Sequence, residues 1–299
     1  MVGLLQVVAT PIGNLDDLTP RASEALRTAD IVLCEDTRHS ARLLALVGSK
    51  ARAVSMHAHN EDGRLPMVLD ALAAGRRVAM VSDAGTPCLS DPGARLVAAV
   101  HEAGFPVHTL PGPFAAAAAI AASGLTPTPF AFWGFLPKKS AARQAALRLR
   151  LTPGPDDGAM THAFYVPGRD LAAVMVDLAT VAADANVVIA RELTKIHEGY
   201  LRGRADGLVV PEEMLRGEAV VLVEVRKALA AADDGNDIDA ALRLILVAAD
   251  RKDALRALAR TTGRSRRGLY QRLLAMEAEG ADAPAAVVAP TPRFDASDP

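Results

Sequence analysis

The chain has 299 residues, of which 51% are hydrophobic and 23% are charged, and its formal net charge is −2. This composition supports a large buried core and excludes a chain that is disordered throughout. A charge so near zero does not by itself indicate a nucleic-acid or membrane-surface protein. Two cysteines give no disulfide framework. The first residues lack a basic segment before a short apolar run, so we expect a soluble, cytoplasmic protein without a membrane partner.

The N-terminal part alternates short apolar runs with segments of helical spacing. Strands are expected at residues 4–9, 31–34, 51–56, 77–81 and 107–110. Thr19 followed by Pro20 is typical of a helix start, and Gly48, Gly75 and Gly104 are typical of helix ends. Five such alternations predict a parallel sheet that is covered by helices on both faces.

A second α/β unit follows, with strands expected at residues 130–136, 162–166, 186–190 and 218–225 and an amphipathic helix at 169–182. The fold class is therefore α/β, with two α/β domains and a small helical C-terminal region. The expected divisions are an N-terminal domain (1–114), a second domain (115–226), a helical basic region (227–280) and a disordered tail (281–299).

An unusual polar segment follows each of the first five expected strands. In chain order these segments are TPIGNLDD, EDTRHS, HAHNED, SDAGTPCLSDPG and PGPFAAAAA. The segments at the opposite ends of the strands lack such an unusual composition. Ligands of open α/β sheets bind at the carboxyl ends of the strands, so this edge is the predicted binding site.

Two of these segments predict a pocket walled by backbone. Ala84 and Gly85 let the chain approach a ligand closely, and Asp83 offers a carboxylate to a hydroxyl or amino group. Neither residues 82–87 nor residues 110–116 contain Lys or Arg to neutralise phosphates. The pattern favours a flat, neutral or cationic small molecule. The absence of the G-x-G-x-x-G and P-loop motifs disfavours the common nucleotide-binding folds.

Two polar groups at this edge leave alternatives open. His57 and His59, near Glu61 and Asp62, could hold a metal ion in principle, but two histidines rarely suffice, so a polar cluster without metal is favoured. The segment 35–38 is either a salt-bridged loop or a functional segment, that is, a substrate clamp or a base.

Several segments between residues 4 and 225 resemble, in order, the motifs of the tetrapyrrole methylase superfamily and of its 16S ribosomal RNA (cytidine 2'-O)-methyltransferase branch. The matching segments are VVATPIGNLDDLTPRA, LCEDTRHSARLL, HNE, VSDAGTPCLSDPG, LPGP, FWGFLP and ARELTKIHE. The resemblance implies S-adenosylmethionine bound in a cleft between two α/β domains, and commonly a homodimer. The donor-binding residues that it implies are Pro11, Asp83, Ala84, Gly85, Leu89, Phe114, Ala115 and Val166.

Two segments depart from the pattern of this family. Phe114 stands where the family usually has a small Ser after PGP. Residues 164–170 read FYVPGRD where the family has FYESPHR, so the family's Glu has no counterpart here and its Arg is displaced.

Positive charge is concentrated in two segments of this nearly neutral chain. Residues 138–150 contain five basic and no acidic residues, and residues 251–272 contain eight basic residues against one acid. Solvated helix faces usually mix signs, so these clusters favour RNA over a tetrapyrrole as substrate. Tyr270 and Arg267 could stack on an unpaired base. The expected RNA-binding residues are Arg38, Lys138, Lys139, Arg143, Arg264, Arg266 and Arg267.

The reaction implied is methylation of a ribose 2'-hydroxyl of a cytidine in 16S ribosomal RNA, within the small ribosomal subunit. The hydroxyl must lose a proton, for which Glu35 and Asp36 are favoured over Asp83, and Lys195 could stabilise a developing alkoxide. No metal is required by this chemistry. Two alternatives stay open: a precorrin or uroporphyrinogen methyltransferase, and a non-catalytic RNA-binding factor of ribosome assembly that keeps the donor pocket.

Overall fold

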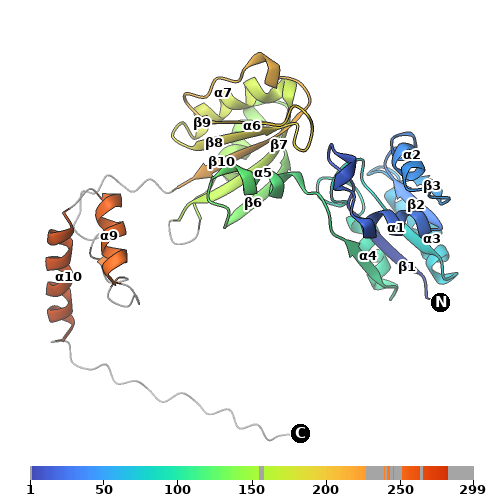
Figure 1. The fold of residues 1–299 in the computed structure, drawn as a ribbon, viewed down its shortest axis with the longest axis horizontal. Coiled ribbons are helices and arrows are strands. Elements are labelled where there is room, and N and C mark those ends of the chain that lie inside the picture. Colours follow the sequence, from blue (N-terminus) through green and yellow to red (C-terminus); the bar gives the residue numbers. More distant parts are fainter. Residues whose placement is uncertain are drawn as a thin grey trace, which may run out of the picture. The chain divides into compact units, whose positions relative to one another are not determined.

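The computed structural model describes residues 2–154, 158–226, 251–262 and 265–281, together with residues 239, 241, 242 and 245. The chain divides into two compact units, Met1–Lys227 and Ala228–Pro299. The first unit contains two five-stranded sheets, and each sheet forms the centre of an α/β domain (Figure 1).

The first sheet is parallel throughout, as its apolar runs predict. Its strands run in the spatial order β3-β2-β4-β1-β5, and every neighbouring pair is parallel. The strands are β1 (Leu4–Val8), β2 (Ile31–Cys34), β3 (Arg52–Ser55), β4 (Arg77–Met80) and β5 (Val107–Leu110). Because β1 lies between β4 and β5, the three loops that leave their carboxyl ends are neighbours.

Helices cover both faces of this sheet, since successive strand side chains point to opposite sides. Leu33 of β2 packs in one core with residues of the helices α3 (Glu61–Ala73) and α4 (Ala94–Glu102). The neighbouring Val32 packs in another core with α1 (Pro20–Thr28) and α2 (Thr37–Leu46). The Thr19 hydroxyl caps α1 by accepting a hydrogen bond from the backbone N–H of Ala22 at 3.1 Å.

The second sheet is mixed, in the order β6-β7-β10-β8-β9. Its strands are β6 (Phe130–Phe135), β7 (Met160–Pro167), β8 (Asn186–Arg191), β9 (Gly199–Arg204) and β10 (Glu218–Val225). Only the β6–β7 pair is parallel; the other neighbours in this sheet are antiparallel. Strand β9 was not predicted from the sequence.

Helices also cover both faces of the second sheet (Figure 1). The Ala-rich helix α5 (Ala115–Ser123) packs on one face, where Ala119 lies in a core with Val220 of β10. The helices α6 (Ser140–Arg150) and α7 (Leu171–Val181) pack on the other face, where Leu178 lies with Val221. The helix expected at residues 169–182 begins as a short 3-10 helix, Gly168–Asp170, and continues as α7.

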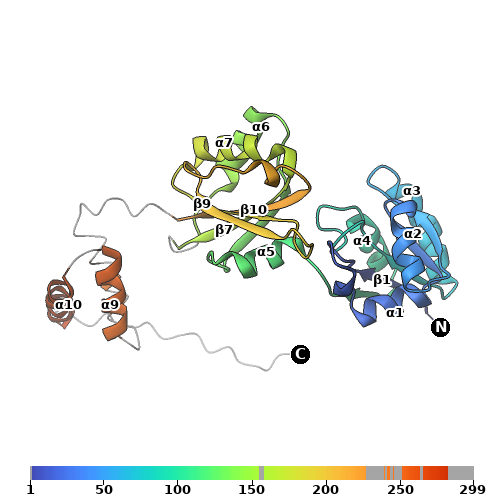
Figure 2. The ribbon, with the colours of Figure 1, turned by 45° about the horizontal axis from the view of Figure 1, so that its top comes forward.

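In the described part of the C-terminal unit, the helices α9 (Arg251–Thr262) and α10 (Arg266–Ala281) lie side by side (Figure 2). Its buried core consists of Leu242, Ile245, Leu255, Leu269, Leu273 and Met276. The expected linker after residue 226, and residues 282–299 of the expected disordered tail, lie outside the described residues. No helix in the part of the chain that the structure describes is long and apolar enough to cross a membrane.

Candidate functional site

The loops that follow β1, β4 and β5 are tied together by hydrogen bonds at the carboxyl edge of the first sheet. Thr10 and Gly85 exchange two backbone hydrogen bonds, with N···O distances of 2.8 and 3.1 Å. The Thr86 hydroxyl donates to the carbonyl oxygen of Pro113 at 3.0 Å. These three loops, whose composition is unusual in the sequence, therefore form one continuous wall.

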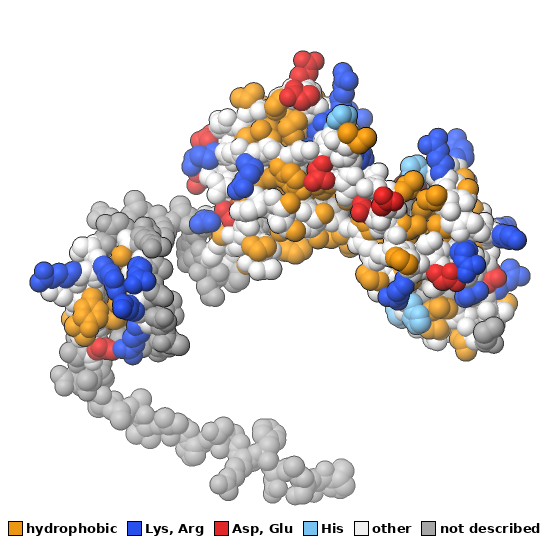
Figure 3. Space-filling model, viewed as in Figure 1, with side chains coloured by type: hydrophobic (Ala, Val, Ile, Leu, Met, Phe, Trp, Pro, Cys, Tyr) orange, Lys and Arg blue, Asp and Glu red, His pale blue; other side chains and the backbone are white. Residues whose placement is uncertain are grey.

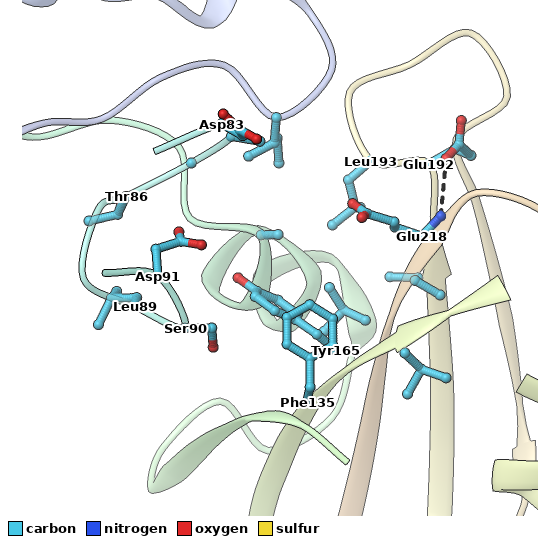
Figure 4. A pocket seen from close by; sticks show the side chains of 18 of the residues that line it. Asp83, Thr86, Leu89, Ser90, Asp91, Phe135, Tyr165, Glu192, Leu193 and Glu218 are labelled. Atoms are coloured by element: carbon cyan, nitrogen blue, oxygen red, sulfur yellow. Dashed lines mark hydrogen bonds between the residues drawn. The ribbon is translucent and has the colours of Figure 1, made fainter. Parts of the chain in front are cut away.

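This wall lines a pocket that the second domain completes (Figure 4). The first domain contributes the loop after β4, with Asp83, Ala84, Gly85, Leu89 and Asp91. The second domain contributes residues at or near the ends of its strands, among them Phe135, Tyr165, Val166, Glu192 and Glu218.

Most of the residues expected to bind the donor line this pocket. They are Asp83, Ala84, Gly85, Leu89, Ala115 and Val166, and Lys195 lines it as well. Pro11 does not, although its neighbour Ile12 does. Phe114 lies outside the lining too, because its ring packs edge-on against Phe132, with 5.1 Å between the ring centroids.

Gly85 is required by its backbone conformation and by its surroundings. Its φ of +80° is one that residues with side chains rarely adopt. A Cβ atom there would lie 3.3 Å from Cγ2 of Ile12 and 3.6 Å from the carbonyl oxygen of Pro113. The backbone itself therefore forms the wall of the pocket at this point.

Four residues with side chains also have positive φ angles beside the pocket. They are Cys88, Ser90, Glu192 and Thr194, with φ between +50° and +74°. Ser90 and Glu192 line the pocket itself. Such conformations cost of order 1–3 kcal/mol each and cluster at functional sites.

The charge of the pocket is mostly negative. Its acidic residues are Asp83, Asp91, Glu192 and Glu218. The single basic residue of the lining, Lys195, forms an ion pair with Glu192, with 3.1 Å between Nζ and Oε1. Such a pocket favours a cationic ligand and disfavours a polyphosphate.

Glu35 lies behind the pocket and is coupled to Asp91. A side-chain hydrogen bond joins the two carboxyl groups, and Oε1 of Glu35 is buried without a hydrogen-bond partner. Burial, followed by the negative charges of Asp91 and Asp83, raises the pKa of Glu35 to about 7. Burial also raises the pKa of Asp91. Glu35 was predicted as a base from the sequence, whereas Asp91 was not, although it belongs to the segment SDAGTPCLSDPG that was expected to form the pocket.

Asp36 has a structural role, which corrects its assignment as a base. Its side chain caps α2 by accepting a hydrogen bond from the backbone N–H of Arg38 at 2.9 Å. It also pairs with the Arg38 guanidinium at 2.9 Å. The hydrogen bonds from Arg38 lower the pKa of Asp36 to about 2, so its carboxylate is a weak base, and it does not line the pocket. Arg38 itself is exposed.

Arg143 is buried, which corrects its assignment to the RNA-binding set. Its guanidinium Nε lies 2.6 Å from Oδ2 of Asp177, and the residue is 5% exposed. It also donates a hydrogen bond to the backbone carbonyl oxygen of Lys138 at 3.0 Å. Arg143 therefore joins α6 to α7 and cannot reach RNA phosphates, whereas the side chains of Lys138 and Lys139 are exposed.

The histidines at the edge of the first sheet form a small polar cluster. The rings of His57 and His59 are 6.1 Å apart, and Nε2 of His57 lies 3.1 Å from Nδ2 of Asn60. Among the described residues, no group of three or more His, Cys, Asp or Glu is arranged to hold a metal ion.

The described part of the C-terminal unit carries a groove with an apolar floor and basic sides. Tyr270 and Leu274 are 52% and 45% exposed there, and Lys252, Arg266 and Arg267 flank them (Figure 3). Arg264, also expected to contact RNA, lies outside the described residues.

Comparison with known proteins identifies relatives of the whole α/β part. Residues 5–209 match the family model of the Tetrapyrrole (Corrin/Porphyrin) Methylases. Three similar proteins carry the name Ribosomal RNA small subunit methyltransferase I. The protein of Micromonospora olivasterospora is 42% identical and covers 93% of this chain and 89% of its own length. The protein of Xylella fastidiosa is 40% identical, and the match covers 90% of this chain and 98% of that protein. The protein of Synechocystis is 39% identical, and the match covers 93% of this chain and 100% of that protein.

Solved structures share the fold. The methyltransferase CobJ has a TM-score of 0.55 at 25% identity, over 76% of this chain and 95% of that chain. A cobalt precorrin-4 methyltransferase has a TM-score of 0.50 at 21% identity, over 74% of this chain and 94% of that chain.

Proposed function

Because the chain belongs to the tetrapyrrole methylase family, and within it to the small-subunit ribosomal RNA methyltransferases, it is a methyltransferase, and we propose that it methylates a ribose 2'-hydroxyl of a cytidine in 16S ribosomal RNA. The proposed methyl donor is S-adenosylmethionine, and no metal takes part. The observation that carries this proposal is the acid-lined, backbone-walled pocket between the two α/β domains.

The pocket fits the chemistry of this donor. S-adenosylmethionine carries a positive sulfonium and an ammonium group but no phosphate, and Asp83, Asp91 and Glu218 place negative charge around the cavity. The close approach that Gly85 permits suits a flat adenine ring. In the proposed arrangement Asp83, Ala84, Gly85, Leu89, Ala115 and Val166 hold the donor. Pro11 and Phe114 would act through their neighbours Ile12 and Ala115.

The surface beside the pocket suits single-stranded RNA. Phe135 lines the pocket and is 54% exposed, and Trp133 on the same edge strand is 39% exposed. The Arg150 guanidinium lies 5.4 Å from the centre of the Trp133 ring. Lys138 and Lys139 follow directly on the exposed loop. Exposed aromatic rings among basic groups bind unpaired nucleotides by stacking and by phosphate contacts.

The C-terminal unit supplies a second proposed RNA contact. Arg266 and Arg267 are exposed at the start of α10, and Tyr270 lies one turn further. These residues, with Arg264, would bind phosphates and stack on an unpaired base. Arg38 stays in the proposed RNA-binding set as well, although it is already paired with Asp36.

The reaction is an in-line displacement. The ribose oxygen forms a bond to the methyl carbon while the carbon–sulfur bond breaks. The electron pair of the carbon–sulfur bond passes to sulfur, which leaves as a neutral thioether. The enzyme contributes alignment of the three atoms and removal of the hydroxyl proton. Lys195 is proposed to stabilise the oxygen as its negative charge develops, from its place beside Glu192 on the pocket wall.

The test is methyl transfer with labelled S-adenosylmethionine to small ribosomal subunits from cells that lack this activity. We expect label in 16S ribosomal RNA, and nuclease mapping should place it on the 2'-oxygen of one cytidine. Label transferred to a precorrin or uroporphyrinogen but not to RNA would overturn the proposal. Donor binding without transfer to either substrate would instead indicate a ribosome assembly factor.

We further propose that the protein acts as a homodimer in the cytoplasm on the small ribosomal subunit. The support for this is the resemblance to the family and the nature of the proposed substrate. Sedimentation equilibrium of the full chain tests the dimer, and a single species of about the mass of one 31.3 kDa chain at micromolar concentration would exclude it.

A further inference from the structure

We propose that Asp91 is the catalytic residue that receives the proton of the attacking hydroxyl, and that Glu35 is a positioning residue that holds the Asp91 carboxyl group from behind. This inference rests on the proposed function, since it assigns the proton acceptor of that reaction. It begins from the finding that a carboxyl group of the pocket wall is paired with a second carboxyl group outside the wall.

The position of Asp91 meets the first requirement of a base, which is access to the reacting atoms. Asp91 lies in the loop after β4 and lines the pocket, and Figure 4 shows its carboxyl group on the cavity side of that loop. Side-chain hydrogen bonds with Glu35 and Ser82 hold it there. Ser82 is itself buried, and its hydroxyl also lies within hydrogen-bond distance of the carbonyl oxygens of Ala84 and Gly85, at 3.2 and 3.3 Å.

The Glu35 side chain is tied to the loop after β4, because it accepts a hydrogen bond from the backbone of Asp83 besides the one that it shares with Asp91. Glu35 directly follows β2, its Oε1 is buried without a hydrogen-bond partner, and it does not line the pocket. A buried carboxyl oxygen without a partner is costly, so its retention beside Asp91 indicates a functional role. The hydrogen bond between Glu35 and Asp91 requires a proton on one of the two groups.

The other carboxylates of the pocket are less suitable as bases. Glu192 is held by Lys195 at 3.1 Å, and its Oε1 also accepts the backbone N–H of Glu218. Burial would raise the pKa of Glu192, but these hydrogen bonds outweigh it and leave the pKa lowered. Asp83 and Glu218 are exposed residues of the wall. Asp91 is the carboxyl group for which burial and neighbouring negative charge both raise the pKa.

The groups that face the pair are negative or neutral. Besides each other, Asp91 and Glu35 face Asp83 and Glu218, and the neutral groups of Cys34, Cys88 and Tyr165. Negative neighbours oppose loss of the last proton from the pair, which agrees with the pKa of about 7 for Glu35. Because the two groups are coupled, this value belongs to the pair.

The proton balance of the step is closed. Before reaction the pair carries one proton, which Glu35 donates in its hydrogen bond to the Asp91 carboxylate. As the ribose oxygen bonds to the methyl carbon and the thioether leaves, the hydroxyl proton passes to Asp91. The pair then holds two protons and releases one of them to water before the next turnover. The rate should therefore fall as the pH rises through about 7, because Glu35 then loses its proton and no longer donates to Asp91.

The test measures methyl transfer to small ribosomal subunits by the full-length protein across a pH series, for the wild type, Asp91→Asn, Asp91→Glu and Glu35→Gln. Asp91→Asn should lower kcat by about 10²–10⁴-fold. Asp91→Glu should recover part of that loss. Donor affinity by calorimetry and KM for the subunit should change much less than kcat in each variant.

Glu35→Gln gives the sharper readout because it keeps a hydrogen bond to Asp91 but removes one titrating group. The Gln amide can donate to Asp91 at every pH, whereas Glu35 loses its proton as the pH rises through about 7. The fall of kcat near neutrality that is expected in the wild type should therefore be absent in Glu35→Gln. Glu24→Gln, on the exposed face of α1, is the matched control and should keep the wild-type profile.

Wild-type kcat in Asp91→Asn, or a fall of kcat in Glu35→Gln at the same pH as in the wild type, would overturn the inference. Both outcomes are read from a wild type that methylates small subunits. If the wild type itself transfers no methyl group to them, the proposed function fails first, so the two failures are distinguishable. Donor binding and thermal unfolding of each variant show whether it is folded.

Discussion

Arg143 and Asp177 form a buried ion pair between α6 and α7, with 2.6 Å between Nε and Oδ2 and side chains that are 6% and 4% exposed. Asp177 also accepts hydrogen bonds from the Ser140 hydroxyl and the Gln144 amide, each at 2.7 Å. Burial alone would raise the pKa of Asp177, but the hydrogen bonds from Gln144, Ser140 and Arg143 outweigh it and leave the pKa lowered. The two helices are thus joined by a satisfied polar network.

Removal of one partner should be strongly destabilising. Asp177→Ala leaves the Arg143 guanidinium buried without its carboxylate, which should cost about 3–5 kcal/mol of unfolding free energy. Denaturant unfolding of the full chain measures the change. Asp184→Ala, at an exposed position after α7, is the control and should change stability by about 0.5 kcal/mol or less. A loss below 1 kcal/mol in Asp177→Ala would show that the pair is dispensable.

The parallel sheet was predictable because its strands are buried on both faces and therefore appear as continuous apolar runs. Strand β2, for example, is fully buried along IVLC. Strand β9 was missed because its sequence, GYLRGR, has no apolar run. It lies at the edge of the second sheet and pairs only with β8, so its side chains need not be buried.

The roles of site residues were predictable where they depend on the local sequence. They were not predictable where they depend on a partner residue far away along the chain. The close approach at Gly85 follows from the local sequence and from its place after a strand. The burial of Arg143 depends on Asp177, and the role of Asp91 depends on Glu35. A charged residue in a sequence reveals its sign but not its partner, which explains both the error at Arg143 and the omission of Asp91.

The wall of the proposed donor pocket should not tolerate a side chain at Gly85. Gly85→Val would strain a backbone with φ of +80° and bring Cβ close to Ile12, so we expect at least a tenfold loss of donor affinity. Asp83→Ala should cost about 1–3 kcal/mol of binding, because a polar group of the donor loses its partner. Isothermal calorimetry with S-adenosylmethionine measures both.

Gly48→Val is the matched control for this prediction. Gly48 has a φ of +66°, but a Cβ atom there meets nothing within 4 Å. The control therefore carries the same backbone strain without the close approach, and should lower stability while leaving donor affinity unchanged. Wild-type affinity in both Gly85→Val and Asp83→Ala would remove this loop from the donor site.

Glu35 should make the protein less stable as the pH rises. Its pKa is raised from 4.5 to about 7 in the folded state, so the folded chain holds this proton more tightly than the unfolded chain does. The resulting stabilisation is complete below about pH 4.5 and is lost as the pH rises through about 7.

Glu35→Gln removes this titration and should raise the melting temperature at about pH 8 by a few degrees, since roughly 2–4 °C corresponds to 1 kcal/mol in a domain of this size. Near pH 4 the variant and the wild type should melt within about one degree of each other, because Glu35 is then protonated in both the folded and the unfolded chain. Scanning calorimetry at both pH values checks the difference. An equal difference in melting temperature at both pH values would mean that the substitution acts through packing rather than through the titration of Glu35.

The C-terminal arginines should contribute to RNA binding and not to the donor pocket. Arg266 and Arg267 are exposed at the start of α10, and Arg264 lies two residues before them in sequence. Each phosphate contact contributes about 0.7–0.9 units to the slope of log affinity against log salt. Replacing Arg264, Arg266 and Arg267 by Ala should weaken binding to small subunits and flatten that slope by roughly two units.

A matched control replaces three exposed arginines of the first domain, Arg27, Arg52 and Arg76, by Ala. Arg52 and Arg76 lie at the amino ends of β3 and β4, which is the sheet edge opposite to the proposed site. The control removes the same total charge, so an equal change of slope in both variants would mean that only net charge matters. Donor affinity should stay at the wild-type value in both. If the C-terminal variant binds and methylates like the wild type at every salt concentration, the basic side chains of α10 are only a solvated helix face, and RNA recognition must then rest on Lys138, Lys139 and the aromatic edge of β6.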